Sequence, residues 1–268
     1  MPPRSIWSGT ISFGLVSVPV RMYAATSSKE LKFHFVTRDE LQPVGYDKVR
    51  KDTGEHVDPD DIVRAFEVEK GRYVPVTDED VDRLDIELTH SIDICDFADL
   101  AEIDPVFYRQ AYFLAPQDGA EKPYALLARA LEETGKVGIA KVVIRNKQHL
   151  AALRPYEGAL VLETMYYADE VRAPEVPKLP AVRKPEVEMA KTLVENLSRS
   201  FEPDRYHDRY RQELLDLIKA KAKGKELPEP EPAEGGEVVD LMAALRESVE
   251  RTKKQTKPRK RSPARKAS

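Results

Sequence analysis

Residues 5–24 constrain the fold of this chain more than any other segment. Apolar side chains alternate loosely with small polar ones on both sides of Gly14, and Gly9 and Pro19 interrupt the two halves. Such alternation in short segments is typical of half-buried β-strands, and glycine permits a turn between them. Arg21 is the one charged residue of the segment. The pattern therefore predicts a pair of short strands that pack into a core.

Short alternating segments continue through the first 172 residues and predict an α+β chain that is mainly β. One amphipathic helix is expected over 121–134, with Gly135 as its end, and a short helix begins after the cap Thr77. Hairpin turns and antiparallel strands around few helices favour a β-barrel or a curved sheet over a parallel α/β fold. The further strands that the pattern predicts cover 31–36, 45–51, 62–68, the residues from the 69–72 turn to 76, 87–97, 106–115, 137–145, 149–156 and 159–165.

Helices replace strands after residue 172. Four prolines between 174 and 185 predict a stiff connector, which a helix over 185–200 follows. A second helix is expected to begin at the cap Asp204 and to carry Tyr206 and Tyr210 on one face. Residues 223–236 form a low-complexity acidic linker, and the basic end of the chain is expected to be disordered. We therefore expect three regions: 1–172, 173–223 and 224–268.

The charges are sorted along the sequence. The net charge is −4 and the isoelectric point about 5.9, which taken alone argues against binding to nucleic acid. Acids are concentrated in 55–104, whereas 136–154 and 251–268 contain basic residues and no acid. Phosphate groups respond to the local potential. Both acid-free stretches are therefore candidate nucleic-acid contacts, although 136–154 is also explained as an ordinary solvated strand face.

The motifs of common enzymes are missing from the sequence. It contains no HExxH, CxxC, GxSxG or GxxxxGK[ST] motif, and its single cysteine, Cys95, excludes a disulfide within the chain and a cysteine-based zinc site. No apolar run approaches the ~20 residues that span a bilayer, and we find no secretory signal. We expect a cytoplasmic, nucleoid-associated protein that is not an enzyme and has no cofactor, metal or membrane partner.

Four segments resemble the bacterial Ku family of non-homologous end joining proteins. They are residues 5–24, GRYVPVTDEDVDRL at 71–84, residues 136–163, and FEPDRYHDRYRQELLDLIKAK at 201–221. The resemblance implies a barrel with inserted bridge strands and a helical C-terminal arm, which forms a homodimeric ring around double-stranded DNA ends. Some relatives carry a cysteine pair near 45–57 as a zinc knuckle; this chain has none there.

Resemblance and charge pattern together select the binding residues. A ring that loads at a DNA end needs phosphate contacts and no base readout. The residues expected to bind DNA are Lys48, Arg50, Lys51, Lys141, Arg145, Lys147 and Arg154 in the core, and Lys253, Lys254, Lys257, Arg259, Lys260 and Arg261 in the tail. A helix over 238–249 resembles the segment that recruits ATP-dependent DNA ligase D, and its apolar stripe consists of Val238, Leu241, Met242, Leu245 and Val249.

Other functions also fit the sequence. A general architectural protein could bind nucleic acid through its basic tail alone, and a protein-interaction scaffold could use the tail and the 238–249 helix as docking elements. That helix could also dock onto its own domain. A ring differs from these alternatives because it prefers linear DNA to closed circles.

Overall fold

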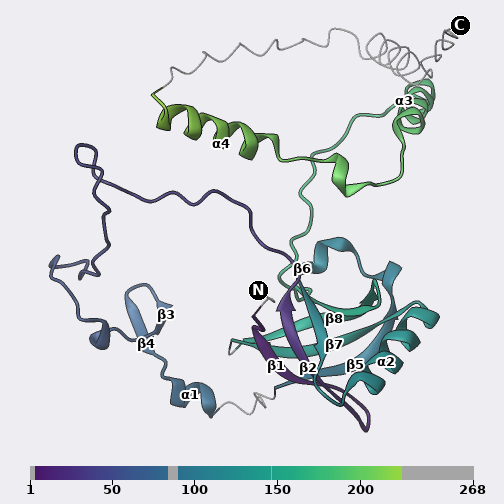
Figure 1. Ribbon diagram of the computed structural model, residues 1–268, viewed down its shortest axis with the longest axis horizontal. Coiled ribbons are helices and arrows are strands. Elements are labelled where there is room, and N and C mark those ends of the chain that lie inside the picture. Colours follow the sequence, from purple (N-terminus) through teal and green to yellow (C-terminus); the bar gives the residue numbers. More distant parts are fainter. Residues whose placement is uncertain (1–3, 84–89, 146, 225–268) are drawn as a thin grey trace, which may run out of the picture. The chain divides into compact units, whose positions relative to one another are not determined.

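A closed β-barrel is the centre of the fold. In the computed structural model, which describes residues 4–83, 90–145 and 147–224, seven strands close the barrel in the order β1-β2-β6-β9-β8-β7-β5 (Figure 1). The expected mainly β barrel is therefore confirmed. Its strands are β1 (Trp7–Phe13), β2 (Val16–Ala24), β5 (Ser91–Asp99), β6 (Tyr108–Pro116), β7 (Lys136–Ile144), β8 (Lys147–Tyr156) and β9 (Ala159–Met165).

The strand pair predicted over residues 5–24 is confirmed. β1 and β2 pair antiparallel from Trp7 opposite Met22 to Phe13 opposite Val16, and Gly14 adopts φ 56° in the turn between them. Gly9 is needed for close packing, because a Cβ atom there would lie 2.1 Å from the carbonyl oxygen of His90. The same atom would lie 2.3 Å from the Trp7 ring. Glycine thus lets β1 pack against the residue that precedes β5.

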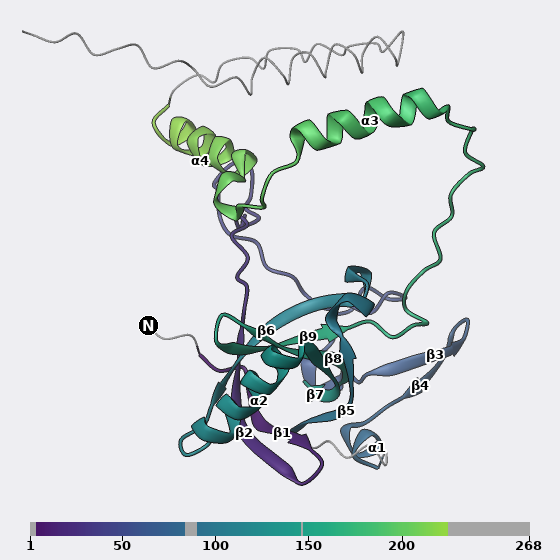
Figure 2. The same cartoon turned by 90° about the vertical axis from the view of Figure 1, so that its right-hand side faces the viewer.

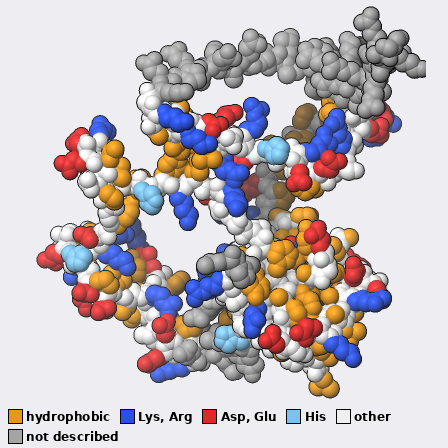
Figure 3. Space-filling model, viewed as in Figure 1, with side chains coloured by type: hydrophobic (Ala, Val, Ile, Leu, Met, Phe, Trp, Pro, Cys, Tyr) orange, Lys and Arg blue, Asp and Glu red, His pale blue; other side chains and the backbone are white. Residues whose placement is uncertain are grey.

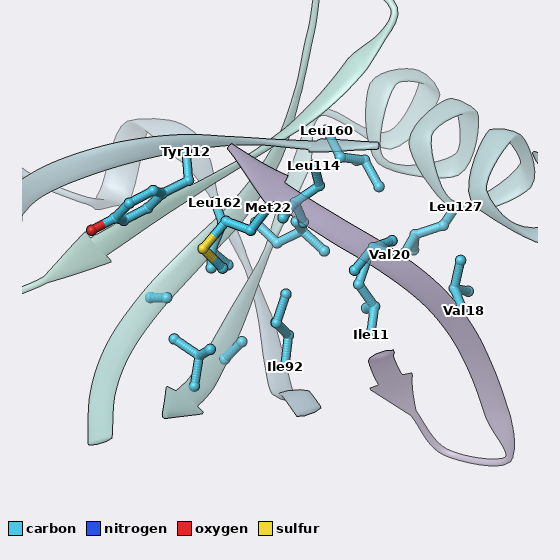
Figure 4. Packing of buried hydrophobic residues seen from close by; sticks show 14 of the residues in the cluster. Ile11, Val18, Val20, Met22, Ile92, Tyr112, Leu114, Leu127, Leu160 and Leu162 are labelled. Carbon is cyan, nitrogen blue, oxygen red and sulfur yellow. The ribbon is translucent and has the colours of Figure 1, made fainter. Parts of the chain in front are cut away.

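Alternate side chains of the strands fill the barrel, and helix α2 (Glu121–Thr134) covers one end of it (Figure 2). Leu127 of α2 belongs to the same buried cluster as Val18 and Val20 of β2 (Figure 4). The Tyr124 hydroxyl donates to the carbonyl oxygen of Leu114 and accepts from the amide of Leu160, both at 2.7 Å. The bounds predicted for this helix are confirmed, since Gly135 ends it at φ 66°.

Between β2 and β5 the chain leaves the barrel, and we call the described residues of this stretch, 25–83 and 90, the arm; the C-terminal helices are not part of it. The arm contains η1 (Pro59–Asp61), the hairpin of β3 (Ala65–Glu69) and β4 (Arg72–Pro75), and α1 (Asp78–Asp82). The 69–72 turn and the Thr77 cap are confirmed: the Asp80 amide donates to Thr77 Oγ1 at 3.2 Å.

Two strands predicted in the arm are wrong. Over 31–36 and 45–51 the structure has only isolated bridges, Val36 opposite Pro43 and Val49 opposite His56. Alternation makes a segment suitable for a sheet, but a strand also needs a neighbouring strand edge for its amide and carbonyl groups. Each segment meets a neighbouring stretch of chain at one bridge only, which is too short a pairing to form a strand.

The chain divides into two compact units, Met1–Ala173 and Pro174–Ser268. The described part of the second unit holds α3 (Lys184–Leu197), η4 (Pro203–Arg205) and α4 (Arg209–Ala222), and none of the residues in these helices is buried. The cap predicted at Asp204 is wrong. Pro203 starts a separate short turn, and the Asp208 side chain accepts from the Arg211 amide at 2.9 Å, so α4 begins later. The three functional regions expected from the sequence stay predictions.

Candidate nucleic-acid interface

The strand directions give the barrel two different ends. Ala24 lies opposite Tyr112, and Tyr108 lies opposite Met165, which lies opposite Leu150. One end of the barrel, which we call the arm end, therefore carries four features. The arm leaves there after β2 and returns there before β5, the chain toward the second unit leaves there after β9, and the β7–β8 turn lies there. Helix α2 and the β8–β9 turn belong to the opposite end, the α2 end.

The register separates the two lysines of the β7–β8 hairpin. Lys141 lies opposite Leu150 and is exposed on the outer face. Lys147 lies opposite Ile144, whose side chain is part of the buried core, so Lys147 projects from the interior-facing side of the rim. Lys141 and Lys147 therefore lie on opposite faces of the hairpin, because opposite residues share a face and successive residues alternate. Arg145 is exposed in the turn, at φ 50°.

Acids from neighbouring strands lie beside three cations of the acid-free stretch. Lys136 Nζ is 2.8 Å from Asp99 Oδ1, and Lys141 lies opposite Asp93 in the β5–β7 pairing. Glu163 accepts two hydrogen bonds from Arg154, which raises the pKa of the arginine. Lys141, Arg145 and Lys147 form no ion pair with any residue that the structure describes, although Asp93 lies opposite Lys141. The stretch is thus acid-free in sequence but largely compensated in space.

Arg109 and His149 lie at the same rim, although the sequence analysis selected neither. The Arg109 guanidinium lies 5.7 Å from the centroid of the Tyr166 ring. Burial lowers the pKa of His149, and Lys147 and Arg109 lower it further, whereas Glu170 opposes them. These interactions bring Arg109, Lys147 and His149 into electrostatic range of one another. We call these three residues the rim cluster. The pairing of β6, β9 and β8 brings them together, and no sequence pattern predicts this arrangement.

The predicted DNA-binding residues of the arm lie in a tight turn. Arg50 donates to both carboxylate oxygens of Asp52, at 3.1 and 2.8 Å, and this contact lowers the pKa of Asp52. The amide of Gly54 donates to the Arg50 carbonyl oxygen at 2.9 Å, which closes the turn. Lys48 and Lys51 are exposed beside it.

The arm exposes a large apolar surface. None of the described residues from 26 to 81 is buried, and aromatic side chains such as Phe33 and Phe35 are 67% and 71% exposed. Figure 3 shows hydrophobic side chains along this segment. Apolar surface of this kind is typical of protein contact sites.

Residues 12–192, which include the arm and all of the barrel from Ser12 onward, match the family model of the Ku70/Ku80 beta-barrel domain.

The chain belongs to the Ku family. It is similar to the non-homologous end joining protein Ku of Bacillus subtilis (strain 168), with 41% identity over 97% of this chain and 85% of the relative. The protein of the same name from Opitutus terrae is 42% identical over 98% of this chain and 99% of the relative. The protein of the same name from Archaeoglobus fulgidus is 40% identical over 93% of this chain and 100% of the relative. The expected family is therefore confirmed over nearly the whole chain.

Several predicted sites of this Ku-family chain lie outside the described residues. They are the ligase-recruiting side chains Val238, Leu241, Met242, Leu245 and Val249, and the tail cations Lys253, Lys254, Lys257, Arg259, Lys260 and Arg261. These assignments stay predictions.

The described residues offer neither a metal site nor a helix that could span a membrane. Over 4–83, 90–145 and 147–224 no group of three or more histidine, cysteine, aspartate or glutamate side chains could hold a metal ion. In the same part of the chain no helix is both long and apolar enough to cross a bilayer.

Proposed function

We propose that this protein binds double-stranded DNA ends in non-homologous end joining. The observation that carries the proposal is the match of the barrel and arm to the Ku family, together with relatives about 40% identical that are named non-homologous end joining protein Ku. Action on broken chromosomal DNA places the protein at the nucleoid in the cytoplasm. The proposed role is binding and recruitment, without catalysis, metal or cofactor.

The proposed assembly is a homodimeric ring. The exposed apolar side chains of the arm support it, because a second copy of the chain would remove them from water. A closed ring has no opening for an uninterrupted duplex. It therefore loads at an end and then slides inward, so its preference for ends requires no base contact.

The proposed DNA contacts combine the arm with the arm end of the barrel. Lys48 and Lys51 supply cations in the arm, where Arg50 supplies a third that also pairs with Asp52, and Arg145 and Lys147 supply cations at the rim. Because the arm leaves and re-enters the barrel at that same end, both sets can act on one duplex. Lys141 and Arg154 have acids beside them and are tested separately below.

The last region of the chain completes the proposal. The basic residues from Lys253 to Arg261 add affinity by displacing counterions from DNA, an effect that weakens strongly with salt. The apolar stripe from Val238 to Val249 recruits ATP-dependent DNA ligase D by laying one helix face into a groove of the ligase.

One experiment tests the ring against both alternatives. The full chain and a variant ending at residue 250 are each titrated with linear duplex and with covalently closed duplex of the same sequence at physiological salt. A ring predicts end preference in both forms, with lower affinity for the shortened one. Equal binding to circles and linear DNA by the full chain would support the architectural protein, and loss of all binding without the tail would support a scaffold.

A further inference from the structure

We propose that the rim cluster, Arg109, Lys147 and His149, binds a phosphate group of DNA at the mouth of the barrel, and that the outer face of β7 at Lys141 does not. The inference rests on the proposed function and deepens it. It adds two residues that neither the sequence pattern nor the family match assigns, and it states which face of the β7–β8 hairpin meets the nucleic acid.

The pairing of three strands brings the cluster together. Tyr108 of β6, Met165 of β9 and Leu150 of β8 stand opposite one another at the arm end. The β6–β9 register shifts between Tyr108 and Gln110, so Arg109 occupies an irregularity of the strand, a place where proteins re-aim a side chain. The Tyr166 ring then holds the guanidinium by a cation–π contact at 5.7 Å.

The charges around His149 leave the cluster short of negative charge. Lys147 faces it from β8, Arg109 from β6 and Glu170 from the residues after β9, while β7 places the uncharged Val142 opposite it. Glu170 also accepts a hydrogen bond from the Tyr167 amide at 2.9 Å. Two permanent cations and a titratable imidazole therefore share a single facing carboxylate. An anion with several acceptor oxygens satisfies this arrangement, and phosphate is the anion that DNA presents.

The inner and outer faces of the β7–β8 hairpin differ in whether an acid lies opposite the lysine. On the outer face Lys141 has Asp93 directly opposite on β5, so a phosphate there would meet an acid at once. On the rim, Lys147 has the apolar Ile144 opposite it on β7; neither lysine forms an ion pair among the described residues, so the difference between them is the acid that faces Lys141. Both lysines are exposed, so exposure alone does not distinguish them.

Proton uptake should accompany binding at this cluster. In the free protein, burial and the two cations lower the pKa of His149. A bound phosphate offsets the cations and raises that pKa again, so DNA binds more tightly as the pH falls through the interval between the two values. Lysine and arginine contacts elsewhere stay charged over the same range and add no such dependence.

The test compares neutral variants of the full-length chain in titrations of linear duplex over a range of salt concentrations. Arg109→Gln and Lys147→Gln should each reduce the slope of log affinity against log salt by about 0.9, the value for one lost phosphate contact. Lys141→Gln is the matched control, and its slope should equal that of the parent. Equal slopes for all four proteins, or a loss confined to Lys141→Gln, would overturn the proposal.

The histidine is tested by pH at constant salt. Affinity of the parent should rise from pH 8 to pH 6 more steeply than that of His149→Gln, while His207→Gln, a change at an exposed position of the second unit, should follow the parent. Coincident pH profiles for the parent and His149→Gln would remove His149 from the site. Thermal unfolding of each variant identifies any that fail to fold.

The phosphate has two possible sources on a broken end. Duplexes with 5′-phosphate and 5′-hydroxyl termini separate them: an Arg109→Gln defect that disappears on the hydroxyl duplex indicates the terminal group, and a defect equal on both indicates the backbone. Failure of the function itself looks different, because the parent then shows no preference for linear over closed DNA. If the parent prefers linear DNA, and Arg109→Gln and Lys147→Gln bind linear DNA as tightly as the parent at every salt concentration, the rim cluster alone is rejected.

Discussion

Arg154 of β8 and Glu163 of β9 form an ion pair with two hydrogen bonds, from Nε at 3.0 Å and from the terminal guanidinium nitrogen at 2.9 Å. The Glu163 side chain is only 15% exposed. The pair joins adjacent strands of the barrel. It occupies two of the five N–H donors of Arg154 and places a carboxylate against the charge with which Arg154 would bind a phosphate.

We therefore expect Arg154→Met to affect stability and leave DNA binding intact. Losing the guanidinium leaves a half-buried carboxylate without its partner, which should lower the free energy of unfolding by about 1–3 kcal/mol. Urea unfolding followed by the fluorescence of Trp7, the single tryptophan, measures this change. The salt dependence of duplex binding should not change. If the slope of log affinity against log salt fell by the amount for one phosphate contact, Arg154 would have to be a DNA-binding residue.

A double variant checks the reason for that loss. Replacing both Arg154 and Glu163 by Met removes the unpaired charge, so it should cost less stability than Arg154→Met alone. A double variant that is less stable than the single one would mean that the lost packing, and not the unpaired carboxylate, causes the effect.

Gly9→Ala should destabilise the barrel strongly for its size. The new methyl group would lie 2.1 Å from the His90 carbonyl oxygen and 2.3 Å from the Trp7 ring, so strand or ring must shift. We expect a loss of about 1–3 kcal/mol in chemical unfolding. Gly45→Ala is the control, because nothing lies within 4 Å of its added atom. A Gly9→Ala protein as stable as this control would contradict the packing seen at β1.

Tyr124→Phe should remove a clamp between α2 and the barrel. Its hydroxyl contacts Leu114 and Leu160 at 2.7 Å, so the variant leaves a buried carbonyl oxygen and a buried amide without their partner. We expect a loss of about 1–3 kcal/mol at neutral pH. Tyr46→Phe, at a position 84% exposed, should change little. Similar losses in the two variants would argue against the clamp.

The same hydroxyl predicts a pH dependence at alkaline pH. Burial raises the pKa of Tyr124 in the folded protein, whereas in the unfolded chain it stays near 10. Its contribution to stability is therefore complete below about pH 10 and is lost as the pH rises through the folded-state value. The stability difference between the parent and Tyr124→Phe should shrink over this range, and unfolding curves at pH 8 and above pH 10 measure it. A constant difference would contradict the assignment.

Phe33→Ser with Phe35→Ser should weaken the dimer. Both rings are exposed in a part of the arm without regular structure, so their loss removes apolar contact area without disturbing a strand. Sedimentation equilibrium should show the parent as a dimer and the variant shifted toward monomer. Leu126→Ser is the control, since this α2 residue is equally exposed, at 72%, but outside the arm. A variant that dimerises as tightly as the parent would exclude these rings from the interface.

Local sequence patterns predicted the barrel elements well. The alternation over residues 5–24, the glycine after the 121–134 helix and the turn at 69–72 each act over a few residues, and the structure has all of them. Patterns failed where the structure depends on distant partners. The 31–36 segment alternates as a strand should but pairs with another stretch only at Val36. The second C-terminal helix begins after Asp208 because that carboxylate, and not Asp204, reaches a free helix amide.

The sequence by itself determined the family, the strand pair that opens the barrel, and the long helix, because turn chemistry and side-chain alternation are local properties. The tertiary structure alone decided how the charges act. It placed Asp93, Asp99 and Glu163 beside the cations of an acid-free stretch, and it joined Arg109 to Lys147 and His149 across three strands. The physical reason is that electrostatic interactions depend on distance in space, and the sheet register, not the order of residues, sets that distance.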